Sequence, residues 1–328
     1  MLPPQRAQSS ICTLIRSLGL AVAIAAACSQ SPRTPTAPTP PSDASVSTPS
    51  PPPSDNPPGP PPVPPFNPTG HTAVVVTVGD IGECGSAAVA LTARLVERID
   101  GALLLSGDLA YMHGSPTDFQ RCFEPDWGQF RHRWRPAPGN HEYETPGAAG
   151  YFQYFGAAAG QGGRSYYSFR AGDWLVLMLN SNIPAGLGSP QFDFVRSELT
   201  ANRNPCTMAV WHHPLFTSGP NGPNIFMRDM WGLLYAQGAD VVLAGHDHLY
   251  ERFGKQDVDG RSDARGLRQF ITGTGGARLY DFQRTSANSQ SRVKAHGVLR
   301  LTLQTQSYDW AFLDTNGAIA DAGADGCH

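Results

Sequence analysis

The sequence has no run of lysines or arginines. Its 24 basic and 27 acidic residues give a net charge of −3. Nucleic-acid binding through backbone phosphates needs a concentrated basic surface, so this composition argues against that function. Long apolar runs are also absent. The run from Leu18 to Ala27 has ten residues, whereas a helix that crosses a bilayer needs about 20. The composition therefore excludes a basic DNA-binding protein and a membrane channel.

Proline is unevenly distributed, and this divides the chain. Seventeen of the 30 prolines lie between Pro32 and Pro68, a segment with few charged or aromatic residues. Such a segment buries too little apolar surface to offset the entropy of ordering, so we predict that residues 29–70 form a disordered linker. Residues 71–328 remain, and they are enough for one large, well-buried domain.

Residues 1–28 are predicted to be an export signal, because Arg6 and Arg16 accompany an apolar run that ends in small residues. The segment from Ala25 to Cys28 resembles a bacterial lipobox, in which the cysteine is lipidated. The same small residues would also serve simple secretory cleavage. We therefore expect an exported protein of the cell envelope that is anchored to the membrane through Cys28, or otherwise a periplasmic or secreted protein.

Hydrophobic patterning predicts a mixed α/β fold. Apolar runs at 73–78 and 102–105 predict buried strands, and residues 86–98 between them have a helical pattern. A strand, a helix and a second strand of this kind form a parallel βαβ unit. The later elements that we expect are a hairpin at 166–179, helices at 189–201 and 225–236, and strands at 208–211, 241–244, 270–272, 298–303, 309–313 and 318–320.

Polar side chains that can bind metal follow successive apolar segments. They are Asp80, Asp108, Asn140 with His141, His212, and His246 with His248. In open α/β sheets, ligands bind beyond the carboxyl ends of the strands, so we expect these five loops to converge on one edge. Oxygen and imidazole donors suit transition metals, and this set is too large for one ion and suitable for two.

The residues around these side chains form five short blocks in a fixed order. The blocks are Gly79-Asp80-Ile81-Gly82, Gly107-Asp108-Leu109-Ala110-Tyr111, Gly139-Asn140-His141-Glu142, His212-His213-Pro214 and Gly245-His246-Asp247-His248. As a set they resemble the calcineurin-like metallophosphoesterase family. Tyr111, three residues after Asp108, narrows the resemblance to the purple acid phosphatase branch. The resemblance runs from about residue 74 to 280. It implies a four-layer αββα sandwich, with two mixed β-sheets flanked by helices.

The resemblance also implies two metal sites that share one ligand. A ferric ion would be bound by Asp80, Asp108, Tyr111 and His248, and a divalent ion (iron, zinc or manganese) by Asp108, Asn140, His212 and His246. Asp108 would join the sites, since each of its two oxygens could take one ion. Tyr111 binds only as phenolate and so needs a highly charged partner such as ferric iron; the alternative is a packed aromatic side chain.

Two more histidines are candidates for catalysis. In the family, the position of His141 contacts the phosphoryl group and can protonate the departing alkoxide, a role that suits imidazole. The alternative is a histidine that only orients its neighbours. His213 occupies the variable position between the ligand histidine and Pro214. It either faces the phosphate as a second cationic contact or simply packs.

Residues 71–328 contain four cysteines, and their spacing matches no zinc ribbon. An even number in an exported protein favours disulfides, for which three pairings exist; buried free thiols are the alternative. We favour Cys84–Cys122 and Cys206–Cys327. The first pair follows two loops of the proposed site, and the second would tie the C-terminus to the start of a core strand.

The expected function is hydrolysis of phosphate monoesters, as in an acid phosphatase, through a hydroxide that bridges two metal ions. The expected partner is a small phosphate ester. A phosphodiesterase or nucleotide hydrolase on the same site is one alternative, and a non-catalytic envelope protein that retains metal or phosphate is another. The segment from Gly273 to Gly276 opens no helix and lacks the lysine of a nucleotide-binding loop. No Gly-x-Ser-x-Gly motif supports a serine hydrolase.

Overall fold

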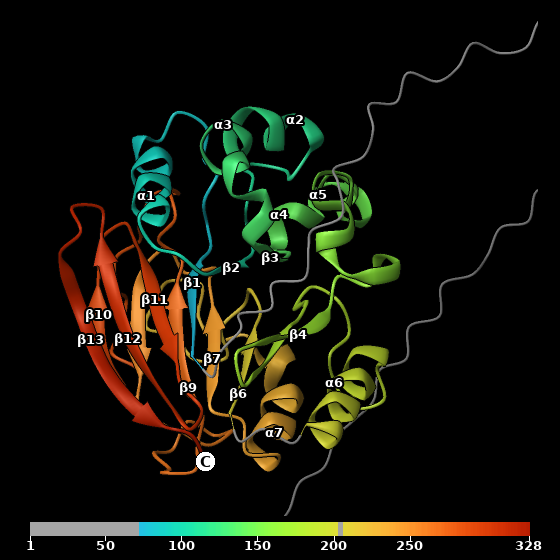
Figure 1. The fold of residues 1–328 in the computed structure, drawn as a ribbon, viewed down its shortest axis with the longest axis vertical. Helices are drawn as coiled ribbons and strands as arrows, with labels where there is room; N and C mark the ends of the chain where they lie inside the picture. Colours follow the sequence, from blue (N-terminus) through green and yellow to red (C-terminus); the bar gives the residue numbers. More distant parts are fainter. Residues whose placement is uncertain (1–71, 203–205) are drawn as a thin grey trace, which may run out of the picture. The chain divides into compact units, whose positions relative to one another are not determined.

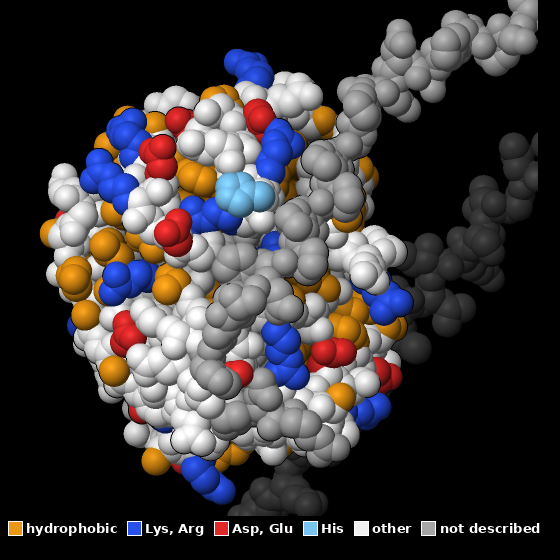
Figure 2. Space-filling view, viewed as in Figure 1, with side chains coloured by type: hydrophobic (Ala, Val, Ile, Leu, Met, Phe, Trp, Pro, Cys, Tyr) orange, Lys and Arg blue, Asp and Glu red, His pale blue; other side chains and the backbone are white. Residues whose placement is uncertain are grey.

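The computed structural model describes residues 72–202 and 206–328. The predicted export signal, Cys28 and the linker lie outside the described residues. In the described part, no helix is both long enough and apolar enough to cross a membrane. Figure 2 shows acidic and basic side chains interspersed on the visible face, in keeping with a net charge of only −3.

Two mixed β-sheets form the centre of the domain (Figure 1). The first has the strand order β13 (Ile319–Gly326), β12 (Ser307–Asp314), β11 (Gly297–Leu303), β1 (Ala73–Val78), β2 (Ala102–Ser106) and β3 (Trp134–Ala137). The second has the order β10 (Ser289–Val293), β8 (Tyr250–Phe253), β9 (Arg268–Thr272), β7 (Val241–Ala244), β6 (Thr207–Val210), β5 (Trp174–Met178) and β4 (Tyr167–Ala171).

The helices connect these strands. They are α1 (Ala87–Glu97), α2 (Pro116–Asp118), α3 (Glu124–Trp127), α4 (Asn140–Tyr143), α5 (Ala149–Phe155), α6 (Pro190–Ala201) and α7 (Arg228–Ala236). Short 3₁₀ or π segments are η1 (Phe119–Phe123), η2 (Gly128–Arg133), η3 (Pro146–Ala148), η4 (Gly156–Ala159), η5 (Gln161–Gly163) and η6 (Ile225–Met227). The predicted helix at 225–236 is therefore a 3₁₀ turn followed by α7.

Side chains alternate between the two faces of each strand, and this builds the layers. In β1, Val75 packs in the core between the sheets, whereas Val76 packs in a second core with residues of α1. In β5, Val176 faces the central core, whereas Leu177 packs in a third core with residues of α6 and α7. Each sheet is thus covered by the other sheet on one face and by helices on the other, which confirms the predicted αββα sandwich.

Parallel strands at the centre of each sheet point their carboxyl ends in a common direction. In the first sheet β1, β2 and β3 are parallel, with Val75 opposite Ala102 and Leu103 opposite Trp134. In the second, β5, β6, β7 and β9 are parallel. The predicted β1–α1–β2 unit is confirmed, and so is the hairpin of β4 and β5, which turns at Gly172-Asp173. This arrangement places the loops after the parallel strands close together.

Candidate metal centre

All seven candidate metal ligands follow parallel strands, six in loops and Asn140 at the start of α4. They are Asp80 after β1, Asp108 and Tyr111 after β2, Asn140 after β3, His212 after β6, and His246 and His248 after β7. Side chains that are distant in the sequence therefore meet at one edge of the sandwich, as expected for ligand sites at the carboxyl ends of strands.

The turns that present these side chains use backbone conformations that non-glycine residues rarely adopt. The φ angle is 57° at Asp80, 52° at Asp108 and 70° at His246, all in the left-handed region. The backbone is also closely packed there, since a Cβ at Gly139 would collide with the Asp108 carboxylate. Such conformations persist only where the surrounding structure enforces them, and they concentrate at functional sites.

The first set of side chains surrounds the hydroxyl of Tyr111. That oxygen lies 3.0 Å from Asp80 Oδ1, 3.3 Å from Asp108 Oδ2 and 3.0 Å from His248 Nε2. His248 Nε2 is in turn 3.2 Å from Asp80 Oδ1. All four residues are buried, and they are the four that the sequence assigns to a ferric ion.

The second set surrounds Nε2 of His212. This nitrogen lies 3.1 Å from Asp108 Oδ2, 3.1 Å from Asn140 Oδ1 and 3.2 Å from His246 Nδ1. His212 is fully buried, whereas Asn140 and His246 are partly exposed. These four residues are the ones that the sequence assigns to a divalent ion.

Asp108 belongs to both sets through a single atom. Its Oδ2 faces Tyr111 and His212, while its Oδ1 accepts a hydrogen bond of 2.9 Å from the backbone N–H of His141. The sequence analysis expected each oxygen to take one ion. The structure instead directs one oxygen toward both sets, because the other is held by the backbone of α4.

The distribution of protons in both sets fits bound cations. Nδ1 of His212 donates to the carbonyl of Ser106 and Nδ1 of His248 to that of Arg278, each at 2.8 Å. In the neutral rings, Nε2 then carries a lone pair, and that lone pair faces the oxygens of the aspartates. Metal-binding histidines commonly donate their second N–H to a carbonyl in this way. The lone pairs of these nitrogens and oxygens point at one another with too few protons between them. A cation in the site would offset their repulsion.

The pKa values of His212 and Tyr111 also indicate that the site favours positive charge. Burial disfavours the charged form of His212, but Asp108, Asp80 and the carbonyl of Ser106 together outweigh it and raise the pKa of His212 to about 9. Burial, followed by the charge of Asp80, raises the pKa of Tyr111 well above its usual value. A phenolate at Tyr111 would therefore form only with a cation beside it.

Comparison with known proteins assigns the family. Residues 73–250, more than half of the chain, match the calcineurin-like phosphoesterase family. The chain belongs to that family. Purple acid phosphatase 18 of Arabidopsis thaliana is 31% identical over 192 residues, which cover 53% of this chain and 43% of the plant protein. Fe(3+)-Zn(2+) purple acid phosphatase 12 of the same plant is 27% identical over 175 residues, covering 46% and 37%. The matches thus span about half or less of the length of these relatives.

The fold of the phosphoesterase is similar to that of a purple acid phosphatase. The structure of purple acid phosphatase PPD1 from yellow lupin (Lupinus luteus) seeds superimposes with a TM-score of 0.66 at 19% sequence identity. The match covers 78% of this chain and 54% of the lupin chain. The resemblance read from the five sequence blocks is therefore confirmed in both sequence and fold.

His141 lies at the exposed side of the first set. Its Nδ1 contacts the carbonyl oxygen of Met112 at 2.5 Å, so this nitrogen must be the donor. Its Nε2 lies 3.8 Å from Asp108 Oδ2, and 22% of the side chain is exposed. The ring also packs against Tyr111, with 4.4 Å between ring centroids. Nε2 thus lies beside the candidate ligands, within reach of solvent.

His213 lies on the other side of the centre. Its ring centroid is 4.4 Å from that of His246, and its Nδ1 is 2.8 Å from the hydroxyl of Ser181. Burial, followed by the charge of His212, lowers the pKa of His213 to about 3. The ring is therefore neutral near pH 7, which favours packing and hydrogen bonding over a cationic contact with phosphate.

Two buried acidic residues that the sequence analysis gave no role hold the loops in place. Glu142 accepts hydrogen bonds of 2.7 to 3.3 Å from the backbone N–H groups of Gly139, Asp108, Leu109 and Ala110. It thereby joins the loop after β2 to the start of α4. Asp247 accepts from the hydroxyl of Thr217 and from the backbone N–H of Asn221. Glu142 could have been found from its place three residues after Gly139, a spacing typical of a capping box.

Both favoured disulfides are present. Cys84 is joined to Cys122, with 4.6 Å between Cα atoms, and Cys206 to Cys327, with 5.4 Å. The first bond links the loop after Asp80 to η1. The second ties the C-terminus to the residue before β6, the strand that leads to His212. The disulfide framework thus supports two of the strands that carry candidate ligands.

Proposed function

We propose that this phosphoesterase hydrolyses phosphate monoesters at a centre of two metal ions. The observation that carries the proposal is the shared Oδ2 of Asp108, which lies between the Tyr111 set and the His212 set. Two sets of four donors with one atom in common suit a pair of neighbouring ions. Membership of the calcineurin-like phosphoesterase family supports a metal-dependent phosphoric-ester hydrolase.

The donors favour different ions in the two sets. Asp80, Asp108, Tyr111 and His248 would hold ferric iron, because a phenolate suits a highly charged ion. Asp108, Asn140, His212 and His246 would hold a divalent ion. The name of one relative, Fe(3+)-Zn(2+) purple acid phosphatase 12, supports this pairing. When bound, the ions would neutralise the phosphoryl oxygens and lower the pKa of a water molecule that attacks phosphorus.

The chain's own residues would orient the ester and supply a proton. Asn140 contributes a neutral amide oxygen, so the centre carries less negative charge against an incoming phosphate. Nδ1 of His141 keeps its hydrogen on the carbonyl of Met112, so Nε2 is the nitrogen that would take up a second proton, and the imidazolium would be the acid. From the exposed side of the first set, it would donate that proton to the departing alkoxide.

The direct test is turnover of p-nitrophenyl phosphate and of bis(p-nitrophenyl) phosphate by the full chain with its native metals. We expect the monoester to be hydrolysed faster, and we expect a chelator to abolish the activity until metal is restored. A preference for the diester would replace the proposed substrate class with phosphodiesters. The absence of turnover on both by metal-replete protein would overturn the proposal in favour of a non-catalytic role.

A further inference from the structure

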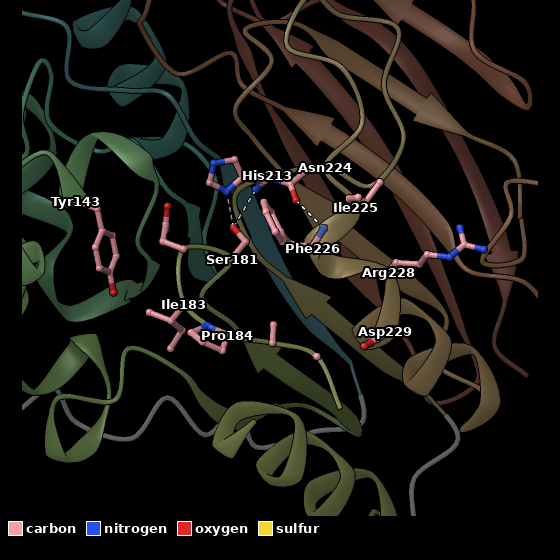
Figure 3. A pocket seen from close by; sticks show the side chains of 13 residues that line it. Tyr143, Ser181, Ile183, Pro184, His213, Asn224, Ile225, Phe226, Arg228 and Asp229 are labelled. Atoms are coloured by element: carbon pink, nitrogen blue, oxygen red, sulfur yellow. Dashed lines mark hydrogen bonds between the residues drawn. The ribbon is translucent and has the colours of Figure 1, made fainter. Parts of the chain in front are cut away.

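A cavity of about 800 Å³ lies beside the metal centre, and we call it the side pocket. Its walls come from α4, from the loop after β5, from the residue after His212 and from the segment that leads into α7. They include Tyr143, Ser181, Ile183, His213, Ile225 and Phe226 (Figure 3). Its volume falls in the range of small-molecule sites.

One imidazole ring lies between the side pocket and the candidate metal ligands. His213 lines the pocket, and its ring centroid is 4.9 Å from that of His212 and 4.4 Å from that of His246. The hydroxyl of Ser181 lies 2.8 Å from His213 Nδ1 and accepts the backbone N–H of His213 at 3.1 Å, contacts that Figure 3 marks. The pocket is therefore a direct neighbour of the centre.

Two polar side chains of the pocket, Arg228 and Asn224, already have partners within the protein. The guanidinium of Arg228 donates to the carbonyl of Val258 at 3.0 Å and pairs with Asp259. The side-chain oxygen of Asn224 accepts the backbone N–H of Phe226 at 3.0 Å. A ligand in the pocket would thus meet polar groups that are occupied, and it would gain little from hydrogen bonds with them.

Two large apolar residues of the pocket, in contrast, are mostly exposed. Ile225 is 70% exposed and Phe226 is 77% exposed, and Ile183 lies in the opposite segment of the wall. Large apolar side chains gathered at a cavity are typical of a binding site, because covering them removes apolar area from water. An aromatic or bulky apolar group would therefore be favoured over a small polar one.

We infer that the side pocket receives the organic group of the ester, and that Ile225 and Phe226 favour phosphate esters of aromatic or bulky apolar alcohols. The inference rests on the proposed function, which places the phosphoryl group at the metal centre. Only the ring of His213 separates the pocket from His212 and His246, so an organic group that extends from the phosphoryl group toward this side would enter the pocket. Small polar esters such as glycerol phosphate leave the pocket unfilled.

The test compares two substrates on three variants of the full chain. The substrates are 1-naphthyl phosphate and glycerol 2-phosphate, and the variants are Phe226→Ala, Ile225→Ala and the control Ile319→Ala. Ile319 is 62% exposed on β13, which contributes no residue to the pocket. We expect the ratio of kcat/KM for the naphthyl ester to that for the glycerol ester to fall about tenfold in Phe226→Ala. It falls less in Ile225→Ala and is unchanged in Ile319→Ala.

A binding measurement separates this inference from the proposed function. Calorimetric titration with 1-naphthylmethylphosphonate, which cannot be hydrolysed, should show binding to the wild type. Phe226→Ala should weaken this binding by about the same factor by which it lowers the kcat/KM ratio of the two esters. Methylphosphonate should bind equally to wild type and Phe226→Ala. An unchanged ratio, or equal losses on both esters, overturns the side-pocket assignment while the proposed function stands. If the wild type hydrolyses neither ester, the proposed function is wrong. In that case, binding of 1-naphthylmethylphosphonate that Phe226→Ala leaves unchanged would overturn the side-pocket assignment as well.

Discussion

One oxygen of Asp108 connects the two halves of the candidate centre. Oδ2 lies 3.3 Å from the Tyr111 hydroxyl and 3.1 Å from His212 Nε2. Its other oxygen, Oδ1, accepts the backbone N–H of His141. The orientation of the carboxylate is therefore fixed by α4, and both ions would depend on the same atom.

Replacing Asp108 with asparagine should disrupt both sites. Asp108→Asn removes the shared negative charge and leaves the other donors unchanged, so we expect loss of at least one ion per chain. Losing one ion's stabilisation of the transition state, several kcal/mol, should slow hydrolysis about a thousandfold or more. Metal analysis and turnover of p-nitrophenyl phosphate measure both effects.

The matched control is Asp193→Asn, an exposed carboxylate on α6 that pairs with Arg196. It should leave metal content and activity at the wild-type level. Full activity with two bound ions in Asp108→Asn would contradict the role given to Asp108.

Glu142 is predicted to stabilise the loops rather than to bind metal. In Glu142→Gln, the amide nitrogen would face backbone N–H groups that now donate to a carboxylate. Leaving such a buried donor without an acceptor costs about 1 to 3 kcal/mol in the free energy of unfolding, which urea denaturation would measure. The exposed Glu144→Gln is the control and should change stability little. Equal stability of the two variants would argue against the positioning role.

Site residues with metal-binding chemistry could be predicted from the sequence, whereas most contacts that hold the loops together could not. Asp80, Asp108 and His212 stand directly after apolar strands, and the ends of parallel strands must meet. Glu142 and Asp247 bind backbone N–H groups and hydroxyls of other loops. The spacing of Gly139 and Glu142 indicates one of these contacts, but the others are set by the folded path of the chain, and no residue pattern identifies them.

At the scale of elements, the buried strands were predictable and the polar strands were not. Strands β1, β2 and β7 are continuous apolar runs because both of their faces are covered. In β8, however, Arg252 pairs with Asp321 of β13 in the other sheet, at 2.8 Å. β3 contains Pro136, which a strand tolerates because β3 is the edge of its sheet. Polar residues and proline interrupt the hydrophobic pattern, so these strands cannot be recognised from it. Ion pairs between sheets and a position at the sheet edge explain such residues, but both depend on the tertiary structure.

The two disulfides should contribute unequally to stability. Cys84–Cys122 closes a separation of 38 residues and Cys206–Cys327 one of 121. In the chain-entropy account, a disulfide of this kind contributes about 3 kcal/mol or more, and the longer loop contributes about 1 kcal/mol more than the shorter. Replacing both Cys206 and Cys327 with serine should therefore destabilise the protein more than replacing both Cys84 and Cys122. Denaturation without reductant measures the difference, and the reverse order would contradict this prediction.

At the scale of the whole molecule, residues 1–70 are proposed to attach the phosphoesterase to a membrane. The basis is the lipobox-like segment that ends in Cys28, followed by a proline-rich linker. We expect Cys28→Ser to move the protein from the membrane fraction to the soluble fraction. Cys12→Ser, which alters a cysteine before the apolar run, should leave the distribution unchanged. Wild-type protein already in the soluble fraction would contradict the lipid anchor.

Two sets of donors, joined at Asp108, are proposed to hold iron through Tyr111 and a second ion through His212. The most direct measurement is metal analysis of the purified full chain together with its visible absorption spectrum. We predict two ions per chain, one of them iron, and a charge-transfer band that disappears in Tyr111→Phe. A single ion per chain, or iron-replete protein without visible absorption, would contradict the account.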